Sequence, residues 1–155
     1  MTISSVFAPP KFEGDEEKTR LAITLNAALW TIILLTLVVN TGNLIGGKIL
    51  IYANLLNLVF LLGCFAIRYI MHQGLIKLAS IITIVFGIFL ITAGIMGLGT
   101  IRTPTTTAYM LVVLIAGLQF GKRGVLHATI SISIILWGLI LAEQNNWLIQ
   151  PDYTV

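Results

Sequence analysis

Charge is scarce in this sequence. Nine of its 155 residues are Lys or Arg and six are Asp or Glu, so charged residues make up 10% of the chain, against about 25% in average soluble domains. Hydrophobic residues make up 57%, and the mean hydropathy is +1.00. A soluble globule of this size would lack the charge to cover its surface. The long apolar stretches instead predict an all-α, polytopic integral membrane protein.

Cysteine and the common catalytic motifs are also nearly missing. Cys64 is the single cysteine, which excludes an intrachain disulfide and a CxxC metal site. The sequence has no Walker loop, no HExxH helix and no nucleophile elbow, and no polar segment long enough for a soluble catalytic domain. The Lys and Arg residues form no patch that would indicate nucleic-acid binding. We therefore expect a protein that is not an enzyme and has no nucleic-acid partner.

What the chain does contain is a series of apolar runs separated by turn residues and charges. Asp15 is placed to cap the first helix, and no cleavable signal peptide is expected because that apolar run has no A-x-A site. The fourth run rises only about 25 Å, a mismatch that local thinning of the bilayer can absorb. Residues 1–20 are predicted to be a tail, 21–142 a membrane bundle and 143–155 an outer tail. Its five predicted membrane-spanning helices are 21–39, 49–70, 75–98, 104–120 and 125–142.

The positions of the basic residues predict the topology. Lys48 and Arg102 fall on one side of the predicted spans and all other Lys and Arg on the opposite side. The positive-inside rule then places the N-terminus in the cytoplasm and the C-terminus outside, in a bacterial inner membrane. Arg68 and Lys77 lie near enough to helix ends to extend toward the interface. The residues expected to anchor the topology are Arg20, Arg68, Lys77, Lys122 and Arg123.

Polar and small residues inside the apolar runs are candidates for helix packing. Asn54 and Asn57 share one helical face and could line a small pocket or bond a neighbouring helix, and packing is the favoured interpretation. Small residues let two backbones approach closely, either within the chain or in a homodimer. The glycines expected to do so are Gly94, Gly97, Gly117 and Gly121.

Two histidines are the only candidates for a cofactor site. His72 and His127 both fall near the predicted cytoplasmic interface. They could be axial ligands of a haem or a chlorophyll-type pigment, or interfacial residues bonded to water or headgroups. No two histidines are paired within one helix, which favours the interfacial interpretation. No cofactor and no metal site are therefore predicted.

The order of three segments resembles a known family. "FAPPKFEGDEEKTRLAITLN" leads into the first span, "GTIRTPTTTAYMLVVLIAGLQFGKRG" makes a loop, a short span and a basic turn, and "LILAEQNNWLIQP" closes the next helix. This resembles the N-terminal multi-span membrane region of bacterial sensor histidine kinases. That resemblance implies a six-helix bundle that precedes cytoplasmic sensor and transmitter domains. The present sequence departs from it, because it lacks the sixth helix, a phosphoacceptor His motif and an ATP-binding domain.

Two functions are consistent with these features. The first is a non-catalytic membrane sensor or anchor module, which would act through a homodimer or another membrane subunit. The second is a small accessory subunit that stabilises a larger respiratory or photosynthetic membrane complex and contacts lipid, quinone or pigment. Both interpretations make the lipid bilayer a partner of the chain.

Overall fold

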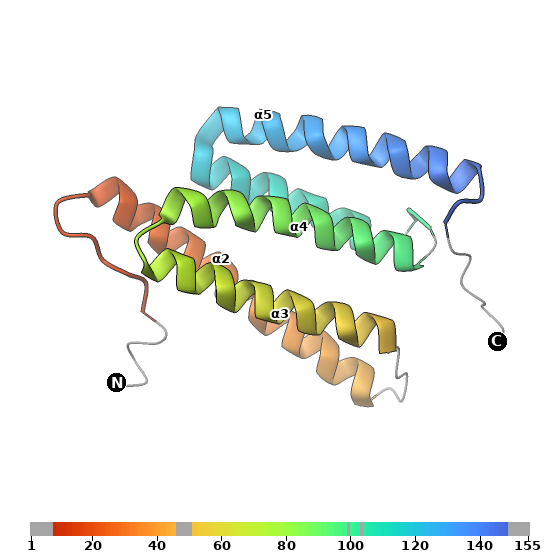
Figure 1. The fold of residues 1–155 in the computed structure, drawn as a ribbon, viewed down its shortest axis with the longest axis horizontal. Coiled ribbons are helices and arrows are strands. Elements are labelled where there is room, and N and C mark those ends of the chain that lie inside the picture. Colours follow the sequence, from red (N-terminus) through yellow and green to blue (C-terminus); the bar gives the residue numbers. More distant parts are fainter. Residues whose placement is uncertain (1–7, 46–50, 99, 103, 149–155) are drawn as a thin grey trace. The chain divides into compact units, whose positions relative to one another are not determined.

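The structure, a computed structural model, describes residues 8–45, 51–98, 100–102 and 104–148. The regular structure within these ranges is helical, and none of it is strand (Figure 1). Four helices among them are long and apolar enough to cross a membrane, in agreement with the predicted all-helical class. The elements are α2 (Glu16–Ile45), α3 (Ile51–His72), α4 (Ile76–Leu98), the 3-10 helix η1 (Pro104–Thr107) and α5 (Ala108–Gln144).

The chain forms two compact units. The first unit, Met1–Thr83, contains α2, α3 and the first turns of α4. The second unit, Ile84–Val155, contains the rest of α4 together with η1 and α5.

In the first unit, α2 begins earlier than the predicted span at residue 21. Asp15 acts as the predicted N-cap, because its Oδ1 accepts a hydrogen bond from the backbone N–H of Lys18 at 2.9 Å. The preceding segment is tied to the same turn, since the backbone N–H of Phe12 donates to Oγ1 of Thr19 at 3.0 Å. The polar residues ahead of the first apolar run are therefore part of the helix or bonded to it.

The other end of α2 differs from the prediction. The helix was expected to end at residue 39, but it continues to Ile45. Oγ1 of Thr41 donates to a main-chain carbonyl one turn back at 2.8 Å, and Asn40 bonds a side chain of α3. Asn40 and Thr41 thus form hydrogen bonds inside a helix, so α2 extends beyond the predicted end of the span at residue 39.

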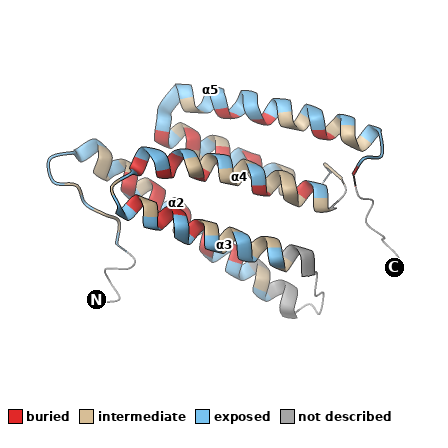
Figure 2. Cartoon of the chain, viewed as in Figure 1, coloured by how far each residue is buried: buried red, intermediate tan, exposed pale blue. Residues whose placement is uncertain are grey.

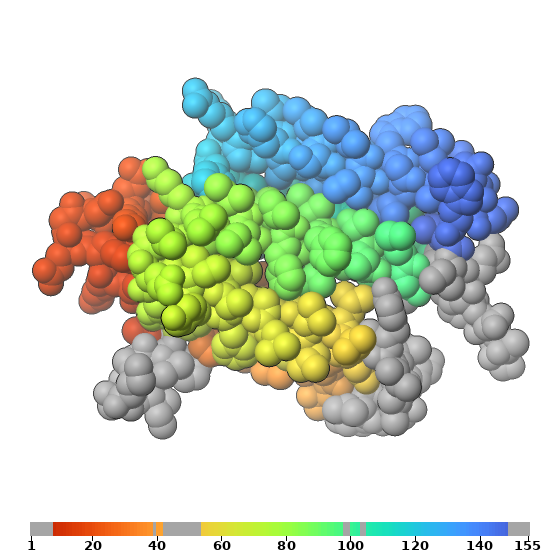
Figure 3. Space-filling model, in the orientation of Figure 1, coloured from red at the N-terminus to blue at the C-terminus, as the bar shows by residue number. Residues whose placement is uncertain are grey.

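Helices α3 and α4 lie close to the predicted spans 49–70 and 75–98, although residues 49 and 50 lie outside the described ranges. Their connection is short, and Gly74 adopts a positive φ of 82° that favours glycine. A Cβ at Gly74 would lie 3.4 Å from Cε1 of Phe12 and 3.7 Å from Nζ of Lys18. The start of α2 therefore packs beside the α3–α4 turn, as the first unit shows in Figure 3.

In the second unit, α5 covers both the fourth and the fifth predicted spans. Its backbone leaves helical geometry at Gly121, with φ 62° and ψ −149°, and there the chain doubles back on itself (Figure 1). A turn was expected over the whole "GKRG" sequence, but Lys122 and Arg123 are helical and the backbone departs from helical geometry at Gly121 alone within α5. We call the two parts the first arm (residues 108–120) and the second arm (residues 122–144).

Glycines allow the two arms to meet this closely. A Cβ at Gly117 would lie 2.9 Å from Cγ2 of Val125, on the opposite arm. A Cβ at Gly124 would lie 2.3 Å from the carbonyl oxygen of Ala116, closer than real side chains come. The close contact at Gly124 is with backbone and leaves no room for a Cβ, whereas the contact at Gly117 is with the end of a side chain.

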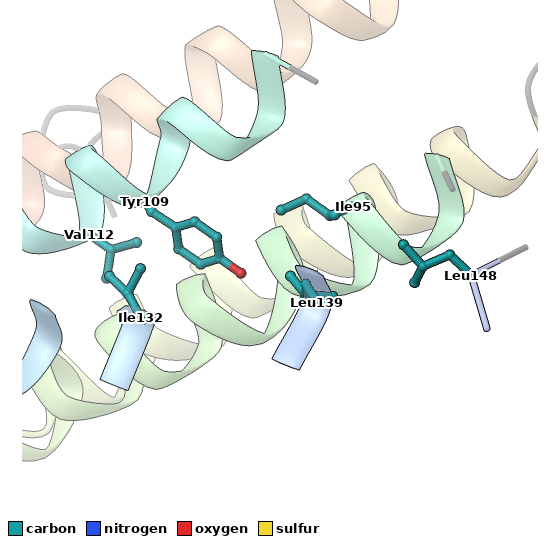
Figure 4. Packing of buried hydrophobic residues seen from close by; sticks show 6 residues of the cluster. All are labelled: Ile95, Tyr109, Val112, Ile132, Leu139 and Leu148. Atoms are coloured by element: carbon teal, nitrogen blue, oxygen red, sulfur yellow. The ribbon is translucent and has the colours of Figure 1, made fainter. Parts of the chain in front are cut away.

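Away from this turn the second unit is held by apolar packing. Figure 4 shows Tyr109 and Val112 of the first arm gathered with Ile132 of the second arm. Oη of Tyr109 also makes a 2.7 Å hydrogen bond with Oγ1 of Thr92. The buried cluster consists of Ile95, Tyr109, Val112, Ile132, Leu139 and Leu148.

The carboxylate of Glu143 bonds the end of α5 to the loop that follows α4. Oε1 of Glu143 accepts a hydrogen bond from Oγ1 of Thr100 at 2.9 Å, and Oε2 accepts a weak bond from the backbone N–H of Ile101 at 3.4 Å. The loop after α4 is thereby fastened to the end of α5. Glu143 and Gln144 were assigned to the outer tail by the prediction but are helical.

Candidate functional site

The candidate site is a polar cluster between α2 and α3 in the first unit. Arg68 lies one turn before the end of α3 and is only 6% exposed. Its Nη1 donates a hydrogen bond to Oδ1 of Asn26 on α2. Its Cζ lies 5.0 Å from the ring centroid of Trp30, one turn further along α2. One guanidinium group is thus held by an amide and an aromatic ring.

The spacing of the residues explains this arrangement. Asn26 and Trp30 are four residues apart, so their side chains lie on the same face of α2. Apolar residues on the same buried face are Leu25, Leu29 and Ile33, all 3% exposed or less. The polar pair therefore lies within the apolar contact of the two helices.

The guanidinium is only partly satisfied. A guanidinium has five N–H donors and no acceptor, and the buried Nη2 of Arg68 has no hydrogen-bond partner among the described residues. No carboxylate in that part of the chain forms an ion pair with it. Burying a charge costs several kcal/mol unless it is paired, and the contacts with Asn26 and Trp30 offset only part of that cost. Arg68 is consequently a buried positive charge that its contacts compensate only in part.

This position corrects the prediction for Arg68. Its side chain was expected to extend toward the membrane interface, as a topology anchor would. It is instead buried against α2, because Asn26 and Trp30 supply an acceptor and a π-face inside the helix pair. The other predicted anchors have exposed side chains: Arg20, Lys77, Lys122 and Arg123.

A second polar contact joins α2 and α3 at their opposite ends. Nδ2 of Asn57 donates to Oδ1 of Asn40 at 2.8 Å, so the side chain of Asn57 bonds α3 to α2. Asn54 is half-buried but makes no hydrogen bond within the described residues. The hydrogen bond to α2 is therefore made by Asn57 and not by Asn54.

The predicted packing glycines have different roles. Gly94 lies beside Thr105, since a Cβ added at Gly94 would lie 3.5 Å from Cγ2 of Thr105. Gly117 packs within α5, so the intrachain alternative holds there. Gly121 provides the reversal and faces open space, while Gly97 is half-buried.

Both histidines have exposed side chains. His72 ends α3, and Nδ1 of His127 lies 2.6 Å from the carbonyl oxygen of Arg123 on its own helix. In the described ranges, no group of three or more His, Cys, Asp or Glu side chains is arranged to hold a metal ion. We therefore derive no cofactor chemistry from these residues.

Three important residues were not singled out from the sequence. Asn26 was one of several intramembrane polar residues, and Trp30 and Gly124 gave no distinctive pattern. A signal did exist for Gly124, because Gly117, Gly121 and Gly124 come in quick succession around the basic pair. For Asn26 the useful signal is a polar residue and a tryptophan four apart in a helix that faces an arginine.

No protein-family model, curated protein or solved structure matches this chain. The resemblance to the membrane region of sensor histidine kinases therefore stays a prediction from sequence pattern. The geometry of the Arg68 cluster is the basis for the function proposed next.

Proposed function

We propose that this chain is a non-catalytic membrane sensor or anchor module of the bacterial inner membrane. It crosses the bilayer five times, with its N-terminus in the cytoplasm and its C-terminus outside. It acts by changing the packing of α2 against α3, and a homodimer or another membrane subunit receives the change.

The reversal of α5 supports five crossings. The first arm together with η1 rises about 27 Å and the second arm about 34 Å, and both approach the roughly 30 Å of a hydrocarbon core. Lys122 and Arg123 are exposed directly after Gly121. Basic residues at the tip of a hairpin favour a cytoplasmic location.

The observation that carries the sensor function is the half-satisfied Arg68. A charged residue inside a helical membrane protein is usually functional. The contact with Asn26 and Trp30 holds Arg68 without compensating its charge. An arrangement held this weakly can be exchanged for another one that satisfies the guanidinium better, and a signal shifts such an equilibrium when it favours one state.

Spin-label distances test the two-state behaviour. Leu35 of α2 and Leu62 of α3 are both exposed, so a Leu35→Cys, Leu62→Cys variant in a Cys64→Ala background can carry one label on each helix. In lipid nanodiscs we expect two distance populations, whose ratio changes when Asn26→Leu removes the acceptor for Arg68. The matched control is Asn54→Leu, which should leave the ratio unchanged. One distance population that Asn26→Leu does not alter would reject the sensor function.

An accessory-subunit function is the second candidate, and an exposed apolar stripe favours it. On the second arm of α5, exposed residues recur every three or four positions, and Figure 2 shows this arm largely in the exposed colour. The stripe consists of Ile130, Ile134, Trp137 and Leu141, each at least 49% exposed. Lipid or a partner helix would cover it. Purification at native expression levels separates the two: stoichiometric recovery with a respiratory or photosynthetic complex would favour the subunit, and recovery alone or as a homodimer would exclude it.

A further inference from the structure

The unpaired N–H donor of Arg68, on Nη2, indicates what kind of ligand could bind there. Nη2 is buried and unpartnered among the described residues, while Nη1 is engaged with Asn26. A guanidinium presents its N–H groups as a planar fork that matches the oxygens of carboxylates and phosphates. Only an anion supplies both the missing acceptor and the missing negative charge.

The depth of Arg68 narrows the source of that anion. Arg68 lies four residues before the end of α3 at His72, which is about 6 Å along the helix axis. When α3 spans a bilayer, this level lies just inside the hydrocarbon boundary, about one helical turn from the headgroup phosphates. If the Arg68 side chain extends toward the end of α3, its guanidinium can reach the phosphate of a headgroup.

The charges around the site agree with an anionic ligand. Lys77 lies in the first turn of the next helix, after the turn at Gly74. Lys18 lies beside the same turn. The acidic residues of the same segment are all exposed, and none makes an ion pair with Arg68 within the described residues: Glu13, Asp15, Glu16 and Glu17.

From these observations we infer that Arg68, with Asn26 and Trp30, forms a binding site for a phosphate oxyanion supplied by a lipid headgroup. This inference rests on the proposed function and names the class of its signal. In the bound state Nη2 donates to a phosphate oxygen. The guanidinium then exchanges part of its contact with α2 for the ligand, so that occupancy changes the packing of α2 against α3.

Trp30 provides a direct reporter for binding. Trp137 and Trp147 are exposed, so Trp137→Phe, Trp147→Phe leaves Trp30, whose ring contacts Arg68, as the single fluorophore. The delipidated protein in dodecyl maltoside is titrated with short-chain phosphatidylglycerol, with inorganic phosphate, and with the matching diacylglycerol that lacks phosphate. Native mass spectrometry of the same samples counts the bound lipids.

We expect saturable fluorescence changes with phosphatidylglycerol and none with diacylglycerol. Arg68→Gln should weaken binding roughly tenfold or more, since a charge-assisted hydrogen bond is worth at least that factor. Arg68→Lys, which keeps the charge and loses the fork, should lie between, and Lys122→Gln, at an exposed basic residue of the second unit, should match the unmutated protein. Saturation by inorganic phosphate as well would support the oxyanion and add a free anion as its source.

Equal binding of diacylglycerol, or unchanged affinity in Arg68→Gln, would overturn the site. Circular dichroism shows whether Arg68→Gln folds, and if it does not, the comparison of the two lipids in the unmutated protein decides. Phosphate binding without any change in the α2–α3 label distances would uphold the site and reject sensing. Two label populations without Arg68-dependent binding would uphold sensing and reject this ligand.

Discussion

The two units of this chain hold their helices together in different ways. In the first unit, α2 and α3 are joined by side-chain polar contacts, Arg68 with Asn26 and Asn57 with Asn40. In the second unit, the arms of α5 are joined by a backbone contact at Gly124 and by a buried apolar cluster. Polar side chains can exchange partners, whereas a backbone contact with no room for a Cβ allows one arrangement. The helices of the first unit can therefore change their packing more readily than the arms of α5 in the second.

The largest effect should come from filling the close contact in α5. In Gly124→Ala, the added Cβ would lie 2.3 Å from the carbonyl oxygen of Ala116, so the arms must separate. We expect the free energy of unfolding in detergent to fall by about 3 kcal/mol, measured by denaturant titration followed by circular dichroism.

Gly138→Ala is the control for this substitution, because Gly138 lies in the same helix with nothing within 4 Å of its added Cβ. It should be neutral or stabilise by up to about 1 kcal/mol through helix propensity. Equal effects of the two substitutions would contradict a close contact between the arms.

A smaller effect is expected from the polar cluster of the first unit. Asn26→Leu removes the acceptor of Nη1 and leaves more of the Arg68 guanidinium buried without a partner. The expected loss of stability is about 1–3 kcal/mol, by the same measurement. Adding Arg68→Met should recover most of it, because an apolar pair of similar volume avoids the cost of burying the charge. If the double variant is less stable than Asn26→Leu alone, the charge is better balanced than the contacts indicate.

The smallest effect is expected at the other end of the same helix pair. Asn57→Ala breaks one hydrogen bond to Asn40, and interhelical hydrogen bonds in membrane proteins average about 0.6 kcal/mol. Asn54→Ala, with no hydrogen bond in the described ranges, should change stability less. If Asn57→Ala lowers the free energy of unfolding by more than about 2 kcal/mol, this hydrogen bond stabilises the helix pair as strongly as the Arg68 cluster, and the two ends do not differ.

The sequence predicted the helical membrane class and placed α3 and α4 to within about two residues. Long apolar runs and the glycine at the α3–α4 turn suffice for that. The inward faces could not be predicted in the same way, because helices that are apolar all round show no amphipathic stripe. The end of α2 was missed because Asn40 and Thr41 look like turn residues until their partners are known.

The Arg68 site could be predicted only in part. Its position near a helix end is equally compatible with a side chain directed at the headgroups and with one directed at α2. The choice depends on Asn26 and Trp30, which meet Arg68 only when α2 and α3 pack in one register. Sequence spacing within a single helix carries no information on that register.

The single non-helical residue of α5 also bears on how the chain enters a membrane. Gly121 is the only non-helical residue within α5. The two arms therefore have no polar loop between them that could stay in water while one arm inserts before the other. We expect a biosynthetic insertion machinery to take up both arms together as one hairpin. An epitope tag or protease site placed between Gly121 and Gly124 would have to unwind part of an arm before it could be reached, whereas the exposed residues Asn145 and Asn146 after the helix offer a site outside it.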